Sequence, residues 1–129
     1  MSETNLFSAT AVDIHRMLVK RFISSEELTN LFLDRITAQN NSLNAVLTVC
    51  PDTAIKEARQ ADKRIRRNEI TPLTGIPILH KDIFCTKGIR TTCGSKMLEN
   101  FFPAYDATVV SRLKNAGAIM LGKCNMDEF

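Results

Sequence analysis

This chain of 129 residues lacks several features that would place it in other classes of protein. No apolar run approaches the roughly 18–20 residues needed to cross a bilayer, which argues against a membrane span. The first residues, Met-Ser-Glu-Thr-Asn, have neither the basic-then-apolar order of a signal peptide nor an arginine-rich transit pattern. We therefore expect a cytoplasmic protein. A net charge of +3 is too small to indicate a surface that binds nucleic acid.

Histidine is scarce, with two residues, and the cysteines lack the spacing that metal binding needs. The four cysteines show no C-x-x-C spacing, so the sequence predicts no zinc site and no metal site of another kind. Small buried thiols in a reducing compartment are the simpler interpretation. The hydrophobic content of 44% and the charged content of 24% are typical of a globular domain. The basic residues of Lys63–Arg67 are most simply the solvated end of a helix, favoured by the helix dipole, rather than a contact for RNA.

The residue pattern predicts an α/β protein whose first part, residues 1–70, is mainly helical. Apolar spacing indicates a helix over about Ala9–Lys20. Ser24-Ser-Glu-Glu27 is a capping box that opens a second helix, and Asn40–Ser42 is expected to end it. A short β-rich run, Ala45–Cys50, precedes a third helix that begins at Pro51 and reaches about Asn68.

Residues 71–129 read as strand, helix and strand, and the first strand carries the most informative residue. Both faces of the predicted strand Ile76–Phe84 are largely apolar, as in a strand covered on both sides of a sheet. Lys81 lies within that run, and a desolvated, neutral lysine can act as a general base. The ordinary alternatives are that Lys81 reaches solvent or pairs with Asp82. Asp82 is a poor partner because neighbouring strand residues face opposite ways.

The segments after this strand suggest a site at one edge of the sheet. In the loop Cys85–Ser95, the hydroxyls of Thr91, Thr92 and Ser95 could bind backbone near Lys81, although ordinary turn and N-cap chemistry is favoured. A helix is expected from Asp106 to Gly117, which is suited to a left-handed cap. A buried strand over Ala118–Leu121 would follow, and Gly122–Phe129 would leave its carboxyl end, where ligands of such folds collect.

Three phrases in this second part carry a resemblance to a known family. They are Gly-Ile-Pro-Ile-Leu-His-Lys-Asp, Ile-Phe-Cys-Thr-Lys-Gly and Asn-Met-Asp-Glu-Phe. Together they resemble the amidase signature family around its catalytic lysine. The resemblance implies an amidase-signature fold, with a mixed sheet core covered by helices. Only the N-terminal part of that fold would be present, so residues 1–129 are expected to form a single incomplete domain.

The resemblance also implies a mechanism and assigns roles to residues. The family hydrolyses amides with a Ser-Ser-Lys triad, and Lys81 matches its general base. Both serines of the triad are expected beyond Phe129, because Ser95 and Ser111 are the only serines after Lys81 and neither lies in a Gly/Ser-rich loop. We therefore expect the chain to be inactive alone. Met126, Asp127 and Phe129 are weaker candidates for lining the site, and a plain structural loop explains them nearly as well.

Within the family, the phrases are most similar to the A subunits of tRNA-dependent amidotransferases. This similarity implies a glutaminase whose ammonia converts Glu-tRNA(Gln) to Gln-tRNA(Gln). The implied partners are a B subunit, which uses ATP and Mg and binds the tRNA, and a small C subunit. No cofactor is expected on this chain. Two alternatives remain: a piece of a stand-alone amidase for small amides, and a non-enzymatic remnant. The sequence also leaves open whether the ammonia donor is glutamine or asparagine, and whether the tRNA that is amidated is tRNA(Gln) or tRNA(Asn).

Overall fold

A three-stranded mixed sheet lies between helices in the computed structural model, which describes residues 6–129. Its strands are β1 (Val46–Val49), β2 (Pro77–Lys81) and β3 (Ile119–Cys124), in the order β1-β3-β2. The central strand, β3, runs antiparallel to β1 and parallel to β2. Because β3 has a neighbour on each side, its residues are buried from Ile119 to Lys123. The predicted α/β class with a mixed sheet is confirmed.

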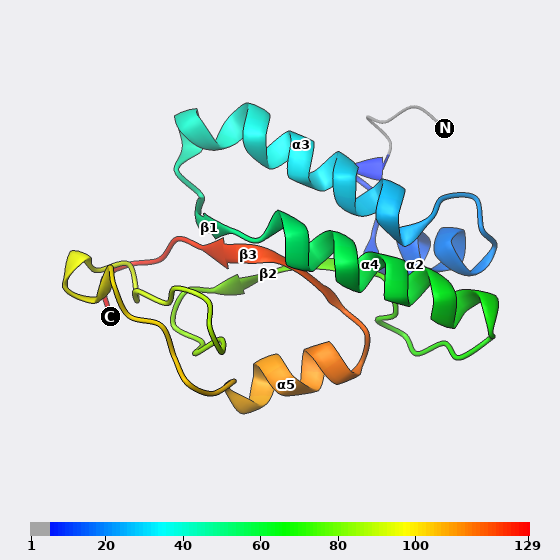
Figure 1. Cartoon of the computed structure of the whole chain (residues 1–129). Helices are drawn as coiled ribbons and strands as arrows, with labels where there is room; N and C mark the ends of the chain where they lie inside the picture. The colour runs from blue at the N-terminus through cyan, green and yellow to red at the C-terminus, as the bar shows by residue number, and fades with distance from the viewer. Residues whose placement is uncertain (1–5) are drawn as a thin grey trace.

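The helices follow the predicted order, with small differences at their ends. They are α2 (Ala11–Val19), α3 (Ser25–Leu43), α4 (Pro51–Arg66), the 3₁₀-helix η1 (Lys96–Leu98) and α5 (Thr108–Asn115). In Figure 1, α3 runs along α4, α4 lies above the strands and α5 lies below them. The helix α3 continues past the expected stop because Asn44, with φ of 49°, supplies its left-handed end instead.

Local capping signals account for the helix starts and turns. The capping box is present: the Ser24 side chain accepts the Glu27 N–H, and the Glu27 carboxylate accepts the Ser24 N–H. Gly117 has the expected positive φ of 85° after α5. A Cβ on Gly117 would lie 3.0 Å from the Cα of Thr74, so close packing as well as backbone conformation favours glycine there.

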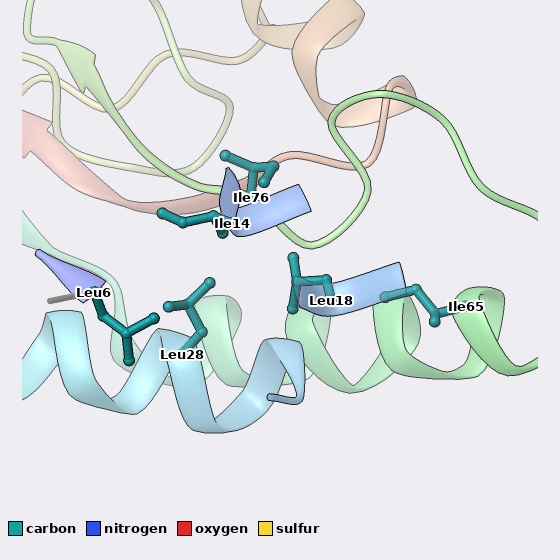
Figure 2. Close-up of a cluster of buried hydrophobic side chains, with 6 residues drawn as sticks. All are labelled: Leu6, Ile14, Leu18, Leu28, Ile65 and Ile76. Carbon is teal, nitrogen blue, oxygen red and sulfur yellow. The ribbon is translucent and has the colours of Figure 1, made fainter. Parts of the chain in front are cut away.

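Two apolar clusters hold the helices and the sheet together. Figure 2 shows the first, in which α2 and α3 meet the start of β2; its buried members are Leu6, Ile14, Leu18, Leu28, Ile65 and Ile76. The second joins α3 and α4 to β3, and its members are Leu33, Ala54, Ala58, Ala61, Ile119 and Leu121. The alanines of α4 are small enough for that helix to lie directly on β3. The core therefore sits on the side of the sheet that α4 covers.

The pairing of β2 with β3 contains an irregularity that decides which side chains share a face. Ile78 pairs with Met120, but the next residue, Leu79, pairs with Gly122, so β3 has one extra residue at this point. Beyond the shift, His80 pairs with Lys123 and Lys81 pairs with Cys124. Paired residues of neighbouring strands lie on the same face, so the shift places Lys123 on the face of His80.

Close approach of β1 explains the glycine in the middle of β3. A Cβ on Gly122 would clash with the carbonyl oxygen of Thr48. We expect Gly122→Ala to force β1 away from β3 and to lower the free energy of unfolding by about 2–3 kcal/mol. Urea denaturation would measure the loss, with Gln60→Ala on the exposed face of α4 as the control. A Gly122→Ala variant as stable as the control would contradict the close contact.

Candidate active site

Lys81 is the last residue of β2, at the carboxyl end of a parallel strand pair. The strand is shorter than predicted because the chain turns at this point: the Phe84 N–H donates to the Lys81 carbonyl at 3.1 Å. The carboxyl ends of β2 and β3 therefore meet at one edge of the sheet, as expected for a ligand site in such folds.

The Lys81 side chain is exposed, and the expectation that it is desolvated is wrong for the described residues. Leu79 and Ile83, which share its face, are 39% and 45% exposed. The described residues cover this face of β2 only in part, and β2 is also an outer strand with β3 on one side alone. In that part of the chain, the Lys81 ammonium has no hydrogen bond or ion pair.

Asp82 faces the other way and is fully buried. One carboxylate oxygen, Oδ2, accepts the N–H of Thr92 at 2.9 Å and its hydroxyl at 2.5 Å. The other, Oδ1, lies 3.5 Å from the Nζ of Lys123. The alternative in which Asp82 pairs with Lys81 is therefore wrong, and the period-two argument against it is confirmed.

Lys123 is a fully buried cation that sequence reasoning missed. Besides its ion pair with Asp82, its Nζ donates to the Phe84 carbonyl and to the Thr91 hydroxyl, each at 2.8 Å. The ammonium thus donates two hydrogen bonds, whereas Oδ1 of Asp82 is held by the ion pair alone and accepts no hydrogen bond within residues 6–129. Burial lowers the pKa of Lys123, and the carboxylate of Asp82 opposes part of that shift.

A signal for Lys123 was present in the sequence but lay beyond the expected end of the strand. The predicted strand stopped at Leu121, whereas β3 continues to Cys124. A lysine near the end of a buried strand raises the same question as Lys81 does. The residue pattern could not predict on which face of the sheet Lys123 lies. The extra residue in β3 changes which residues of β3 share a face with which residues of β2.

Three hydroxyl side chains of the Cys85–Ser95 loop form hydrogen bonds, two with the buried Lys123–Asp82 pair and one at the start of η1. Thr91 and Thr92 bind the side chains of Lys123 and Asp82, respectively, rather than backbone around Lys81. Ser95 is an N-cap, as favoured: it accepts the Met97 N–H at 3.2 Å at the start of η1. The loop is thus attached to the sheet through charged, buried groups.

The segment Asn125–Phe129 leaves β3 at the same edge, next to the loop. The Phe129 N–H donates to the Cys93 carbonyl at 2.9 Å, and the Met126 carbonyl lies against Gly94. Asp127 and Phe129 have exposed side chains. Within the described residues, none of the three weaker candidates forms a hydrogen bond or ion pair with the Lys81 side chain, and their role stays a prediction.

A cavity of about 310 Å³ lies on the opposite face of β2 from Lys81. His80 and Glu57 line it together with Met120 of β3 and Val110 of α5. Burial lowers the pKa of His80 and raises that of Glu57.

Among residues 6–129, no cluster of three or more His, Cys, Asp or Glu side chains could hold a metal ion. None of the described helices is both long and apolar enough to cross a bilayer.

Comparison with known proteins identifies the class to which this fold and this lysine-bearing edge belong. The family model described as Amidase matches residues 27–129, which include β2, the loop and β3. The chain belongs to the amidase family.

Curated relatives within the family include A subunits of glutamyl-tRNA(Gln) amidotransferases. The A subunit of a glutamyl-tRNA(Gln) amidotransferase from Dehalococcoides mccartyi is 54% identical over 126 residues, covering 98% of this chain and 26% of its own length. Its counterpart from an Azoarcus species is 55% identical over 124 residues, covering 96% of this chain and 26% of its own length. The chain thus spans about a quarter of the length of these curated relatives.

Solved structures share the fold described above. An amidase family protein from Bacillus anthracis superposes with a TM-score of 0.90 at 36% identity, covering 98% of this chain and 26% of that one. The peptide amidase of Stenotrophomonas maltophilia gives a TM-score of 0.87 at 37% identity, covering 94% of this chain and 25% of its own. The predicted amidase-signature fold is therefore confirmed.

The chemistry open to this edge follows from the groups that it contains. An amine can act as a base where a substrate or further chain excludes water around it. Lys81 is exposed within residues 6–129, so that cover would have to be added to the described residues. The two serines after Lys81 have other positions: Ser95 caps η1 and also donates to Glu128 at 2.5 Å, and Ser111 lies within α5. The described residues thus supply a candidate base but no serine nucleophile placed beside it.

Proposed function

We propose that this chain is the lysine-bearing part of a glutaminase subunit of a tRNA-dependent amidotransferase. The observation that supports this most strongly is the 54% identity, along nearly the whole chain, to the A subunit of a glutamyl-tRNA(Gln) amidotransferase. Identity to the peptide amidase is lower, at 37%, which favours the amidotransferase over a stand-alone amidase. In this proposal the protein works in the cytoplasm.

The proposed reaction uses Lys81 as the base. A nucleophilic serine, contributed by residues outside this chain, attacks the side-chain amide carbon of glutamine. Its proton passes through a second serine to the Lys81 amine and then to the leaving nitrogen. Ammonia departs as the C–N bond breaks, backbone amides stabilise the oxyanion, and water then hydrolyses the γ-glutamyl ester to glutamate.

The proposed partners complete the overall reaction. A B subunit would bind the tRNA and use ATP with Mg to activate its glutamyl group, which then takes up the ammonia. A C subunit would join the A and B subunits. No residue of this chain is assigned to a cofactor.

The first test concerns the gene and then its product. Reading the gene past codon 129 should reveal an open frame that contains a Gly/Ser-rich nucleophile loop. The full-length protein, meaning the complete product of that gene, should then release glutamate from glutamine when purified with its partners. A stop codon directly after Phe129, or a full-length protein that hydrolyses only other amides, would contradict the proposal.

A further inference from the structure

The buried pair Lys123–Asp82 is placed next to the candidate base rather than elsewhere in the core. Both side chains are fully inaccessible, and their charged atoms lie 3.5 Å apart. A buried ion pair is a weak source of stability, since well-packed apolar residues in its place are often at least as stable. Its location beside Lys81 therefore calls for a reason other than stability.

One hydrogen bond of the pair holds the turn that follows Lys81, and backbone hydrogen bonds hold the same turn. Lys123 holds the Phe84 carbonyl, and the Phe84 N–H in turn holds the Lys81 carbonyl. The Asp82 N–H donates to the Cys124 carbonyl at 3.1 Å, which ties the residue after Lys81 to β3. The carbonyl of Lys81 and the N–H of Asp82, which belong to the peptide group that follows Lys81, are thus both hydrogen-bonded.

The loop beyond this turn is attached to the same two charges. Thr91 binds Lys123, and Thr92 binds Asp82 with both its N–H and its hydroxyl. The Cys93 N–H then donates to the Asp82 carbonyl at 3.1 Å. Removing the Lys123 charge would take away side-chain bonds to both the turn and the loop, and removing the Asp82 charge would weaken the bonds to Thr92.

The Lys81 side chain has no such support of its own. It is exposed, and within residues 6–129 no side chain binds its ammonium. The backbone from His80 to Phe84 therefore sets where the Lys81 side chain starts and the direction of its Cα–Cβ bond. The register shift in β3 is what brings Lys123 to the buried face, directly behind this backbone.

From this arrangement we infer that Lys123 and Asp82 are positioning residues for Lys81, a step that rests on the proposed function. They hold the β2 turn so that the Lys81 amine points from the sheet edge toward the substrate side. They act through backbone and do not touch the substrate. A base displaced by about 1 Å can lose a hundredfold in rate, so this support has a measurable effect on turnover.

The test uses the full-length protein with four variants. Lys123→Met keeps length and removes the charge, Asp82→Asn does the same for the acid, and the double variant removes both. Thr91→Val is a milder change that takes away one acceptor of Lys123. Lys63→Met, on the exposed surface of α4, is the control.

Two readouts separate positioning from folding. Each variant of the pair should lower kcat for glutamine hydrolysis at least tenfold, with KM changed less than twofold, and Thr91→Val should lower kcat less. The double variant should recover thermal stability yet keep the low kcat. In limiting acetic anhydride, the acetylation rate of Lys81, measured by mass spectrometry relative to the exposed Lys56, should change at least threefold in each pair variant and stay unchanged in Lys63→Met.

The outcomes distinguish failure of this inference from failure of the proposed function. If the double variant regains wild-type kcat and Lys81 acetylation along with stability, the pair is only structural and the inference is overturned. If Lys81→Met itself retains glutamine hydrolysis, the proposed function fails. The acetylation rates then still decide whether the pair positions Lys81, because they do not depend on turnover.

Discussion

Lys123→Met is expected to lower the free energy of unfolding by about 3–5 kcal/mol, since it leaves the Asp82 carboxylate buried without a counter-charge. The size of the effect follows from the geometry. Asp82 is fully inaccessible, and its remaining partners are the N–H and hydroxyl of Thr92. The Phe84 carbonyl and the Thr91 hydroxyl would also lose a donor. Urea denaturation of the full-length protein measures the loss.

The double variant Lys123→Met with Asp82→Asn tests the same explanation of the stability loss. Because both charges are gone, it should be more stable than Lys123→Met alone, and a double-mutant cycle then gives the coupling between the two residues. Lys63→Met should change stability by less than about 0.5 kcal/mol, because Lys63 is exposed. A loss below about 1 kcal/mol for Lys123→Met would show that Asp82 is not held as described.

Lys81→Met should reduce glutamine hydrolysis by the full-length protein about a thousandfold or more, the scale seen when a member of a catalytic triad is removed. Stability should hardly change, because the Lys81 side chain is exposed and makes no hydrogen bond or ion pair among the described residues. Lys81→Arg should be just as inactive, since a guanidinium does not give up its proton. Glutamate release measures the rate, with Lys63→Met as the control.

A second measurement on Lys81→Met separates the proposed base from a general defect. If the partner subunits retain their chemistry, the variant complex should still form Gln-tRNA(Gln) when ammonium chloride replaces glutamine. Loss of both activities would point to misassembly. Retention of more than about a tenth of the glutamine-dependent rate would contradict the assignment of Lys81 as the base.

Local signals predicted most of the secondary structure. The Ser24–Glu27 capping box, the proline at the start of α4 and the glycine after α5 each act within a few residues, and each lies where the pattern indicated. The ends of strands were less well predicted. β2 stops at Lys81 because of a turn, and β3 runs on to Cys124 because both of its neighbours continue to pair with it.

The site was predicted in part. The motif around Lys81 placed the chain in its family, and the family match confirms that membership, whereas the role of Lys81 stays a prediction. The burial of Lys81 was predicted wrongly from an apolar run. That run would be covered on both faces only in a strand with full layers around it, and in the described residues the face of Leu79 and Lys81 stays partly exposed.

The sequence by itself determined the helices, their caps, the strand that carries Lys81 and the family, because these depend on neighbouring residues and on short motifs. Only the tertiary structure decided which charges meet. Asp82 and Lys123 are 41 positions apart, and their pairing depends on one extra residue in β3 that turns Lys123 to the face of Asp82. Residue spacing sets alternation within one strand, but the register between two strands is set by packing across the sheet.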